Sequence, residues 1–233
     1  VMASVNLRGV YVDRDELGTA YEHAETMLEE TTATLYDLSG VRNVSNSINW
    51  SSTQQVVEVL LAAGVPLRER TRAGALTIKE SVLLPLREKY PIVDALLRYR
   101  AESKLITGFL DPYLRVLTDE DPYLHPTLKL TGTATGRLSC ANPNLQQVPR
   151  EGPLKRAFVP RPGMSGYGIV DLEQAELRIA ALLSEDESLA ETLNGEDLHR
   201  TGAAQVLGIP PEEVTSLQRK AFKRVIFGLL YGG

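Results

Sequence analysis

Four side chains that could bind a nucleotide recur every four residues near the end of the chain. They are Arg219, Lys223, Phe227 and Tyr231, and two glycines follow. Four residues overshoot a helical turn by only about 40°, so the four form one slowly winding stripe. Two cations suit a polyphosphate, an aromatic ring suits a base, and the phenol would lie near the sugar. Any one of these cations alone is better explained as part of a solvated helix face.

A carboxylate that could hold a divalent cation lies upstream of this stripe. Asp171 follows Tyr167–Val170, an apolar segment that we expect to be a buried strand. A carboxylate at the end of a buried strand is a rigid support for Mg2+, which takes one or two protein carboxylates and completes its shell with water and phosphate. Taken alone, Asp171 is better explained as a helix N-cap.

The elements that would position these residues follow from apolar periodicity and from turn residues. Pro91 is expected to close or kink a helix, and Thr215 to cap the last one. The Pro- and Thr-rich stretch 119–149 predicts short strands and turns, and 158–160 another strand. Helices are expected at 14–39, from Ser51 or Ser52 to Gly64, and at 81–90, 92–110, 174–183, 187–193, 197–207 and 216–231.

Composition restricts the class of protein. The 233 residues make one large domain or two small ones, and 43% hydrophobic residues are ample for a core. The 24% charged content and the lack of low-complexity tracts argue against disorder. A single cysteine, Cys140, excludes an internal disulfide framework and indicates a reducing compartment. No apolar run reaches the roughly 18 residues of a membrane span, and the first residues lack a signal-peptide pattern, so a cytoplasmic protein without membrane contact is expected.

Charge is unevenly distributed. The net charge of -5 argues weakly against nucleic-acid binding, but phosphate binding needs only a local basic surface. Basic residues gather at 68–79, 98–104, 155–161 and 219–224. Each cluster alone is more readily explained as a solvated helix face, and their recurrence raises the case for nucleic acid only modestly.

Three blocks together resemble the family A DNA polymerases. Residues 171–178 read D-L-E-Q-A-E-L-R and are similar to that family's motif A, D-Y-S-Q-I-E-L-R. The helix from Arg219 to Gly232 is similar to motif B, R-x3-K-x3-F-x3-Y-G. Residues 131–149 resemble its T-x-T-G-R-L-S and P-N-L-Q-x-I-P segments. With weaker likeness at 9–13 and 98–105, nearly the whole chain is covered.

The resemblance implies an α+β, right-hand polymerase fold in partial form, with a helical thumb, an incomplete antiparallel palm sheet and incomplete helical fingers. The implied boundaries are a palm-associated first segment at 1–13, the thumb at 14–118, the palm with motif A at 119–180, and the fingers at 181–233.

It also implies roles for the nucleotide-site residues. Asp171 and the Leu172 carbonyl would bind two Mg2+ ions, with Mn2+ as an alternative. Arg219 and Lys223 would hold the triphosphate, Lys223 would also protonate the pyrophosphate leaving group, and His199 would reach a phosphate.

The remaining implied contacts are with the base, the sugar and the DNA. Phe227 would stack on the base, while Glu176 and Tyr231 would close the space of a ribose 2′-OH. Ala175 replaces the bulkier Ile of the family motif, so strict selection against a ribose is less firmly expected. Glu173 replaces the usual Ser. Gln174 would also lie at the nucleotide. The implied primer–template contacts are Arg137, Asn144 and Gln146, and the implied thumb contacts with the duplex are Arg72, Lys79 and Lys104.

Two-metal phosphoryl transfer needs carboxylates on both sides of the metal pair, and the family's third motif, H-D-E, is not found here. We therefore expect the partners to be primer–template DNA, a dNTP and a C-terminal polymerase half, in a bacterial cell or phage-infected host. Two alternatives stay open: a non-catalytic duplex-binding module, and a single-subunit RNA polymerase, against which Glu176 and Phe227 argue.

Overall fold

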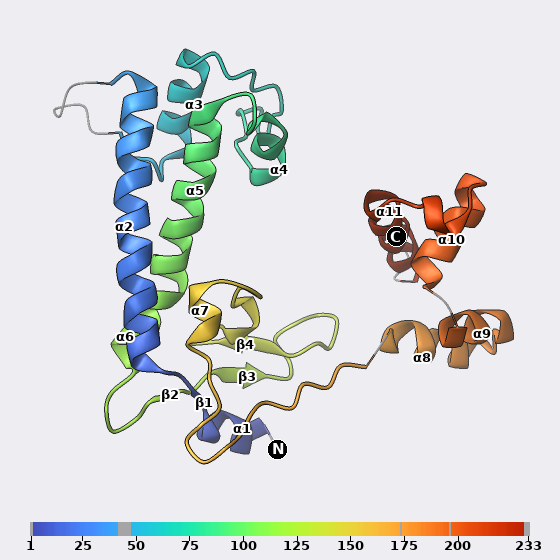
Figure 1. The fold of residues 1–233 in the computed structure, drawn as a ribbon. Helices are drawn as coiled ribbons and strands as arrows, with labels where there is room; N and C mark the ends of the chain where they lie inside the picture. Colours follow the sequence, from blue (N-terminus) through green and yellow to red (C-terminus); the bar gives the residue numbers. More distant parts are fainter. Residues whose placement is uncertain (1, 42–47, 173, 196, 231–233) are drawn as a thin grey trace. The chain divides into compact units, whose positions relative to one another are not determined.

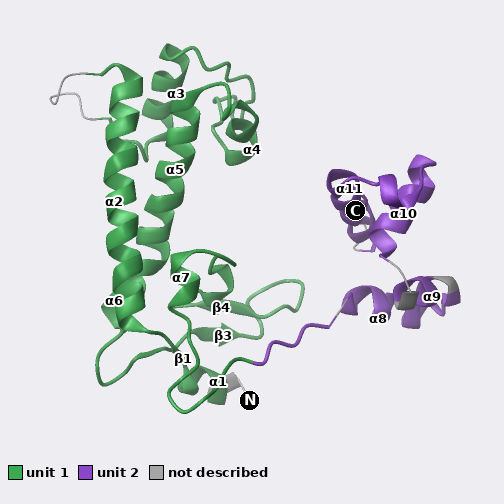
Figure 2. Ribbon diagram, in the orientation of Figure 1, with its two compact units in different colours: residues 1–167 green, residues 168–233 purple. Residues whose placement is uncertain are grey.

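The computed structural model describes residues 2–41, 48–172, 174–195 and 197–230 (Figure 1). The chain divides into two compact units, residues 1–167 and residues 168–233 (Figure 2). Helices with two small antiparallel sheets make up unit 1, and helices make up unit 2, which agrees with the expected α+β class. Within the described ranges, no helix is long and apolar enough to cross a membrane.

Two long helices, α2 (Arg14–Ser39) and α5 (Pro91–Leu105), lie side by side in unit 1 (Figure 1). α2 begins where the Asp13 carboxylate accepts hydrogen bonds from the amides of Asp15 and Glu16, at 3.0 and 3.1 Å. It ends at Gly40, whose φ of +69° suits a residue without a Cβ. The bounds predicted for this helix are therefore confirmed.

A separate hydrophobic core lies at one end of this helix pair, where α2 ends and α5 begins. Two short helices, α3 (Thr53–Ala62) and α4 (Glu80–Leu83), pack there, and a single 3-10 turn (Leu84–Leu86) follows α4. Trp50 packs edge-on against Tyr36, with ring centroids 5.6 Å apart. The buried members are Leu35, Trp50, Val56, Leu60, Val65, Leu67, Ile78, Leu83, Ile92, Val93, Ala95 and Leu96.

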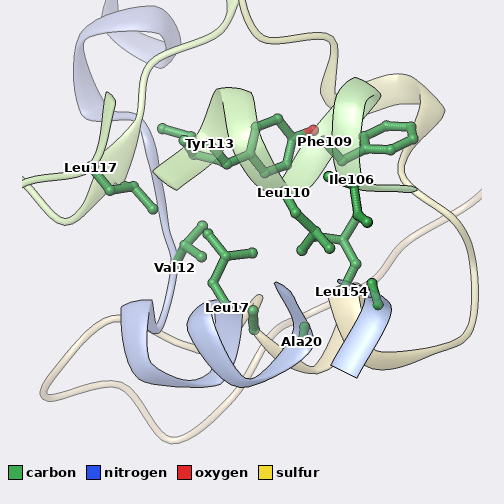
Figure 3. Packing of buried hydrophobic residues seen from close by; sticks show 12 residues of the cluster. Val12, Leu17, Ala20, Ile106, Phe109, Leu110, Tyr113, Leu117 and Leu154 are labelled. Atoms are coloured by element: carbon green, nitrogen blue, oxygen red, sulfur yellow. The ribbon is translucent and has the colours of Figure 1, made fainter. Parts of the chain in front are cut away.

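The opposite end of the pair carries a second core, shown in Figure 3. α5 continues into a π-helical turn (Ile106–Leu110) and then α6 (Asp111–Val116), and the short helix α7 (Pro153–Arg156) packs against α2. Side chains of α2 point toward those of the π-helical turn and α6 (Figure 3). The buried members are Val12, Leu17, Ala20, Ala24, Ile106, Phe109, Leu110, Tyr113, Leu117, Leu124, Leu154 and Ala157.

The sheets of unit 1 are small. After α1 (Met2–Arg8), β1 (Val10–Tyr11) pairs with β2 (Tyr123–Leu124), so that Val10 faces Leu124. β3 (Thr127–Lys129) pairs with β4 (Ser139–Ala141), with Leu128 opposite Cys140, and a 3-10 turn (Leu145–Gln147) follows. Both pairings are antiparallel, which confirms the short strands and turns predicted for residues 119–149.

Several local predictions are wrong. The helix predicted at 81–90 is much shorter, because α4 ends at Leu83 and only a 3-10 turn at Leu84–Leu86 follows it. Pro91 begins α5 instead of closing the preceding helix, because a proline at the first helical position gives up no hydrogen bond. Residues 158–160 and 167–170 are extended but belong to no strand, because no described segment pairs with their backbone. The second segment is also not buried: Ile169 and Val170 are 89% and 91% exposed.

Unit 2 consists of four helices in its described part, with a 3-10 turn (Pro211–Glu213) before the last. They are α8 (Ala175–Ser184), α9 (Glu187–Gly195), α10 (Leu198–Leu207) and α11 (Ser216–Leu230). Their positions agree with the four predicted helices to within a few residues. One small cluster joins α8 to α9 and α11 through Leu177, Ala181, Leu193 and Ile226, and another joins α10 to α11 through Ala203, Ala204, Val214 and Phe222.

Candidate functional site

The stripe predicted from its four-residue spacing lies on α11. Thr215 begins this helix, because its hydroxyl accepts a hydrogen bond from the Gln218 amide at 3.2 Å, while the Gln218 side chain accepts one from the Thr215 amide at 2.8 Å. The predicted cap is therefore confirmed. Arg219, Lys223 and Phe227 follow on the helix, whereas Tyr231 lies outside the described residues.

α10 lies close to this stripe because Gly202 has no side chain. A Cβ built on Gly202 would lie 2.3 Å from the ring of Phe222 on α11, far inside van der Waals contact. Arg200 adds a second connection, since its guanidinium donates to the carbonyls of Pro211 and Val214 at 3.2 and 3.1 Å. These bonds hold the start of α10 to the segment that leads into α11.

Two residues at the start of α10 meet the stripe. Asp197 is the N-cap, and its Oδ1 accepts a hydrogen bond from the Arg200 amide at 3.3 Å. Its Oδ2 accepts a hydrogen bond from Arg219 Nε at 2.6 Å in a half-exposed ion pair. The ring of His199 lies 6.1 Å from that of Phe227, and Lys223 Nζ lies 5.7 Å from the Phe227 centroid. The structure therefore brings together His199, Arg219, Lys223 and Phe227.

His199 is held neutral in this cluster. It is only 3% exposed, and no described group hydrogen-bonds to its buried Nδ1. Burial lowers the pKa of His199, and the charges of Lys223 and Arg219 lower it further, against the opposing charge of Asp197. A buried ring nitrogen without a partner costs free energy, so a hydrogen-bonding ligand at this position would be stabilised.

The ion pair also acts on the Asp197 carboxyl. Burial alone would raise the pKa of Asp197, but the hydrogen bond and the charge of Arg219 outweigh it and lower that pKa. Asp197 is thus a fixed negative charge among the cations of the cluster.

The predicted metal ligands lie on an extended and exposed segment. The side chains of Asp171 and Leu172 face solvent, and Glu173 lies outside the described residues. The N-cap position of α8 is taken by Gln174, with φ +52°, so the interpretation of Asp171 as a helix cap is wrong. No three His, Cys, Asp or Glu side chains of the described part gather where they could hold a metal ion. A carboxylate beside a backbone carbonyl is nonetheless a donor pair suited to Mg2+.

Glu176, one of the two residues predicted at the sugar, and Gln174, predicted at the nucleotide, lie at the start of α8. Glu176 is half-buried in its first helical turn. The Gln174 side-chain oxygen is buried, and no described group hydrogen-bonds to it. Leu177 and Ala181 of α8 pack against Leu193 and Ile226, which connects this helix to α11. The contact expected between Glu176 and Tyr231 lies outside what the structure describes.

Three predicted DNA contacts lie near each other in unit 1. The Asn144 side chain accepts a hydrogen bond from the Gln146 amide at 3.1 Å, and the Gln146 side chain donates to the Leu138 carbonyl at 3.2 Å. The Arg137 carbonyl accepts a hydrogen bond from Thr133 at 2.6 Å. These bonds fix the shape of one exposed surface around Arg137, Asn144 and Gln146.

The three predicted thumb contacts are exposed on loops and helices of unit 1. Arg72 lies in a turn closed by a hydrogen bond from the Thr71 amide to the Ala75 carbonyl at 2.7 Å, and Lys79 precedes α4. Lys104, near the end of α5, lines a surface pocket of about 360 Å3 between α5 and the α4 region. Arg87, Arg98 and Arg100 line the same pocket. Arg87 and Arg98 both form ion pairs with Asp94, and Glu80 also lines the pocket, so its surface is only partly cationic.

Asp197 was missed from the sequence. It stands 22 positions from Arg219, and its type and position suggest only a helix N-cap. Only the close packing of α10 on α11 brings the carboxylate to the guanidinium, so no local pattern could have found the pair.

Comparison with known proteins gives a consistent answer. The family model described as DNA polymerase family A matches residues 14–233. The thermostable DNA polymerase I of Thermus thermophilus is 35% identical over the whole chain, which covers 28% of that protein. DNA polymerase I of Chloroflexus aurantiacus is 32% identical, and the chain covers 25% of it. Among solved structures, the POL domain of Pol1 from M. smegmatis in complex with DNA primer-template and dNTP is 31% identical, with a TM-score of 0.76 over 97% of this chain and 40% of that one.

The chain thus spans about a quarter of the length of the curated relatives it matches. The structural match confirms the expected fold, a partial polymerase domain of helices with small antiparallel sheets. Since the matched region includes the three sequence blocks and nearly the whole chain, the protein belongs to DNA polymerase family A.

Proposed function

We propose that this chain supplies the nucleotide-binding residues, and one metal-binding carboxylate, of a template-directed DNA polymerase. The reaction would be attack of a primer 3′-OH on the α-phosphate of a dNTP. The observation that carries this proposal is the cluster on α10 and α11, where two cations, a buried histidine and an aromatic ring gather. This combination suits a ligand that is both a polyphosphate and a planar base.

Within the cluster, Arg219 and Lys223 would hold the triphosphate and Phe227 would stack on the base. The 5.7 Å between Lys223 Nζ and the Phe227 ring lets one ligand touch both. His199 Nδ1, buried and without a described partner, would bind a phosphate oxygen directly or through water. Lys223 would also donate a proton to the pyrophosphate leaving group.

Asp171 and the Leu172 carbonyl would bind the catalytic Mg2+ ions, with Mn2+ as an alternative. The metal would neutralise the charge that develops during phosphoryl transfer. Two-metal chemistry needs carboxylates on both sides of the pair, and Asp171 has no such described companion. We therefore propose that activity requires a C-terminal polymerase half that carries a second carboxylate.

Sugar selection would fall to Glu176 and Tyr231, with Gln174 beside them. A glutamate that fills the space of a 2′-OH excludes a ribonucleotide by volume, and this separates the proposal from an RNA polymerase. Ala175 is small and half-buried, so this selection is proposed to be less strict than with a bulkier residue.

Unit 1 would bind the primer–template. Arg137, Asn144 and Gln146 would contact it near the primer terminus, and Arg72, Lys79 and Lys104 would contact the duplex backbone. The proposed subdivision is a palm-associated segment at 1–13, thumb at 14–118, palm at 119–180 and fingers at 181–233. The core of Figure 3 joins residues on both sides of position 118, so thumb and palm would share one packed base.

The test measures dNTP binding by the purified chain using calorimetry. We expect Lys223→Ala and Phe227→Ala each to weaken binding by about tenfold or more, because each removes a direct contact. Lys220→Ala is the matched control, since Lys220 is an exposed cation on the same helix but outside the stripe. Equal binding by Lys223→Ala and the wild-type chain would contradict the proposal.

A second experiment addresses catalysis. The chain alone should not extend a primer, whereas the chain mixed with a C-terminal polymerase half should, and Asp171→Asn should abolish that extension. Primer extension by the chain alone would exclude the proposed need for a second half. Duplex binding that survives without Mg2+, with no extension in any mixture, would instead favour a non-catalytic duplex-binding module.

A further inference from the structure

The Asp197–Arg219 ion pair has a consequence for phosphate binding that neither residue has alone. Arg219 Nε is already occupied by Asp197 Oδ2 at 2.6 Å, whereas a guanidinium has five N–H donors in a fixed fork. Among the described residues, no hydrogen bond from the two terminal nitrogens of Arg219 is seen, so their donors could bind a ligand. Asp197 is itself held by the Arg200 amide, so the guanidinium is anchored to the start of α10.

The same pair changes the charge of the cluster. Arg219 and Lys223 are cations, His199 is neutral because its pKa is lowered, and Asp197 is an anion. The cluster therefore has a net charge of about one positive unit at neutral pH instead of two. A polyphosphate anion is bound less tightly by such a cluster than by two uncompensated cations.

We propose that Asp197 is a positioning residue that fixes Arg219 by its Nε edge and limits the affinity of the cluster for polyphosphate. The inference rests on the proposed nucleotide site and deepens it. A polymerase that binds triphosphate too tightly would also retain inorganic pyrophosphate, the product that must leave after each addition. Asp197 would keep that product weakly bound while holding the guanidinium in place for the substrate.

The side-chain chemistry allows the two roles to be separated. Asp197→Asn removes the charge and keeps one acceptor oxygen, so its side chain can accept from Arg219 Nε or cap α10, but not both as the carboxylate does. Asp197→Ala removes charge, hydrogen bond and cap together. The matched control is Asp186→Asn, because Asp186 caps the neighbouring helix α9 through the Leu189 amide at 2.9 Å and carries the same charge.

The experiment is calorimetric binding of inorganic triphosphate and pyrophosphate to the 233-residue chain at low ionic strength. Asp197→Asn should bind both anions about three- to tenfold more tightly, the change expected for a unit charge removed at a half-exposed position. That gain should shrink in concentrated salt. Asp197→Ala should gain less than Asp197→Asn, since its Arg219 is no longer anchored, and Asp186→Asn should match the wild type.

An independent readout checks the charge balance without any ligand. The chain has three histidines, so NMR can follow the titration of His199 by itself. Removing the Asp197 charge should lower the pKa of His199, whereas Asp186→Asn should leave it unchanged. An unchanged His199 pKa in a folded Asp197→Asn chain would show that the Asp197 charge does not act on the cluster, and would count against the inference.

Unchanged or weaker anion binding by a folded Asp197→Asn chain would overturn the inference, as would binding that Arg219→Ala does not reduce. Failure of the proposed function looks different. If only the proposed function is wrong, Asp197→Asn would still bind inorganic triphosphate more tightly, but Phe227→Ala would bind dNTP as well as the wild type does. If none of these chains bound triphosphate, both the inference and the proposed function would fall.

Discussion

We expect the close approach of Gly202 to Phe222 to decide whether Asp197 and His199 on α10 reach Arg219 and Phe227 on α11. A Cβ on Gly202 would lie 2.3 Å from Phe222 Cε1 and 2.5 Å from Cζ, against 3.4–4 Å for ordinary contact. Gly202→Ala therefore forces the ring, or all of α11, to move by about 1 Å or more. Such a movement would lengthen the Asp197–Arg219 contact and separate His199 from Phe227.

A matched substitution separates the effect of overpacking on stability from the effect of helix propensity. Replacing glycine by alanine inside a helix gains about 1 kcal/mol of intrinsic propensity, and overpacking typically costs about 1–3 kcal/mol. Apart from its own helix backbone, no described residue lies within 4 Å of a Cβ built on Gly228 of α11, so Gly228→Ala should show the gain alone. The two variants should thus differ in the stability of unit 2 by about 1–3 kcal/mol, with Gly202→Ala the less stable.

Hydrogen exchange with mass spectrometry is the suitable assay, because it reports on peptides of α10 and α11 separately from unit 1. Exchange in both helices should be faster in Gly202→Ala than in Gly228→Ala, and triphosphate binding should be weaker. Indistinguishable exchange and binding in the two variants would refute the idea that this close approach assembles the site.

Three further outcomes are expected. Leu110→Ala should lower the free energy of unfolding by about 3–5 kcal/mol in urea titrations, while the half-exposed Leu84→Ala should cost less than about 1 kcal/mol. Asp13→Ala should cost about 1 kcal/mol in the same assay, since it removes the cap of α2. Burial and nearby cations lower the pKa of folded His199, so unit 2 should lose stability as pH falls below about 6.5; hydrogen exchange should show a smaller loss in His199→Asn.

The sequence predicted most helices because each has a long apolar period and a recognisable end. α2 has an aspartate cap and a terminal glycine, and α11 has a threonine cap, so their bounds could be read directly. Pro91 was misassigned because proline both ends one helix and begins another, and the sequence alone does not decide which.

The predictions that failed depended on contacts between distant segments. Apolar residues at 167–170 have the composition of a strand, but a strand also needs a pairing partner, which composition does not supply. The nucleotide stripe was predictable because its members lie within one helix. Asp197 was not, because its contact with Arg219 depends on how α10 packs against α11.

The extended segment 168–172 is expected to promote association between copies of the chain in concentrated solution. Its backbone makes no hydrogen bond to another described residue, and Ile169, Val170 and Leu172 are exposed. A row of unpaired amides and carbonyls flanked by apolar side chains is a template for pairing with the same segment of another molecule. Self-association should therefore increase steeply with protein concentration, and a single Ile169→Lys substitution, which adds a charge to that edge, should suppress it in light-scattering measurements.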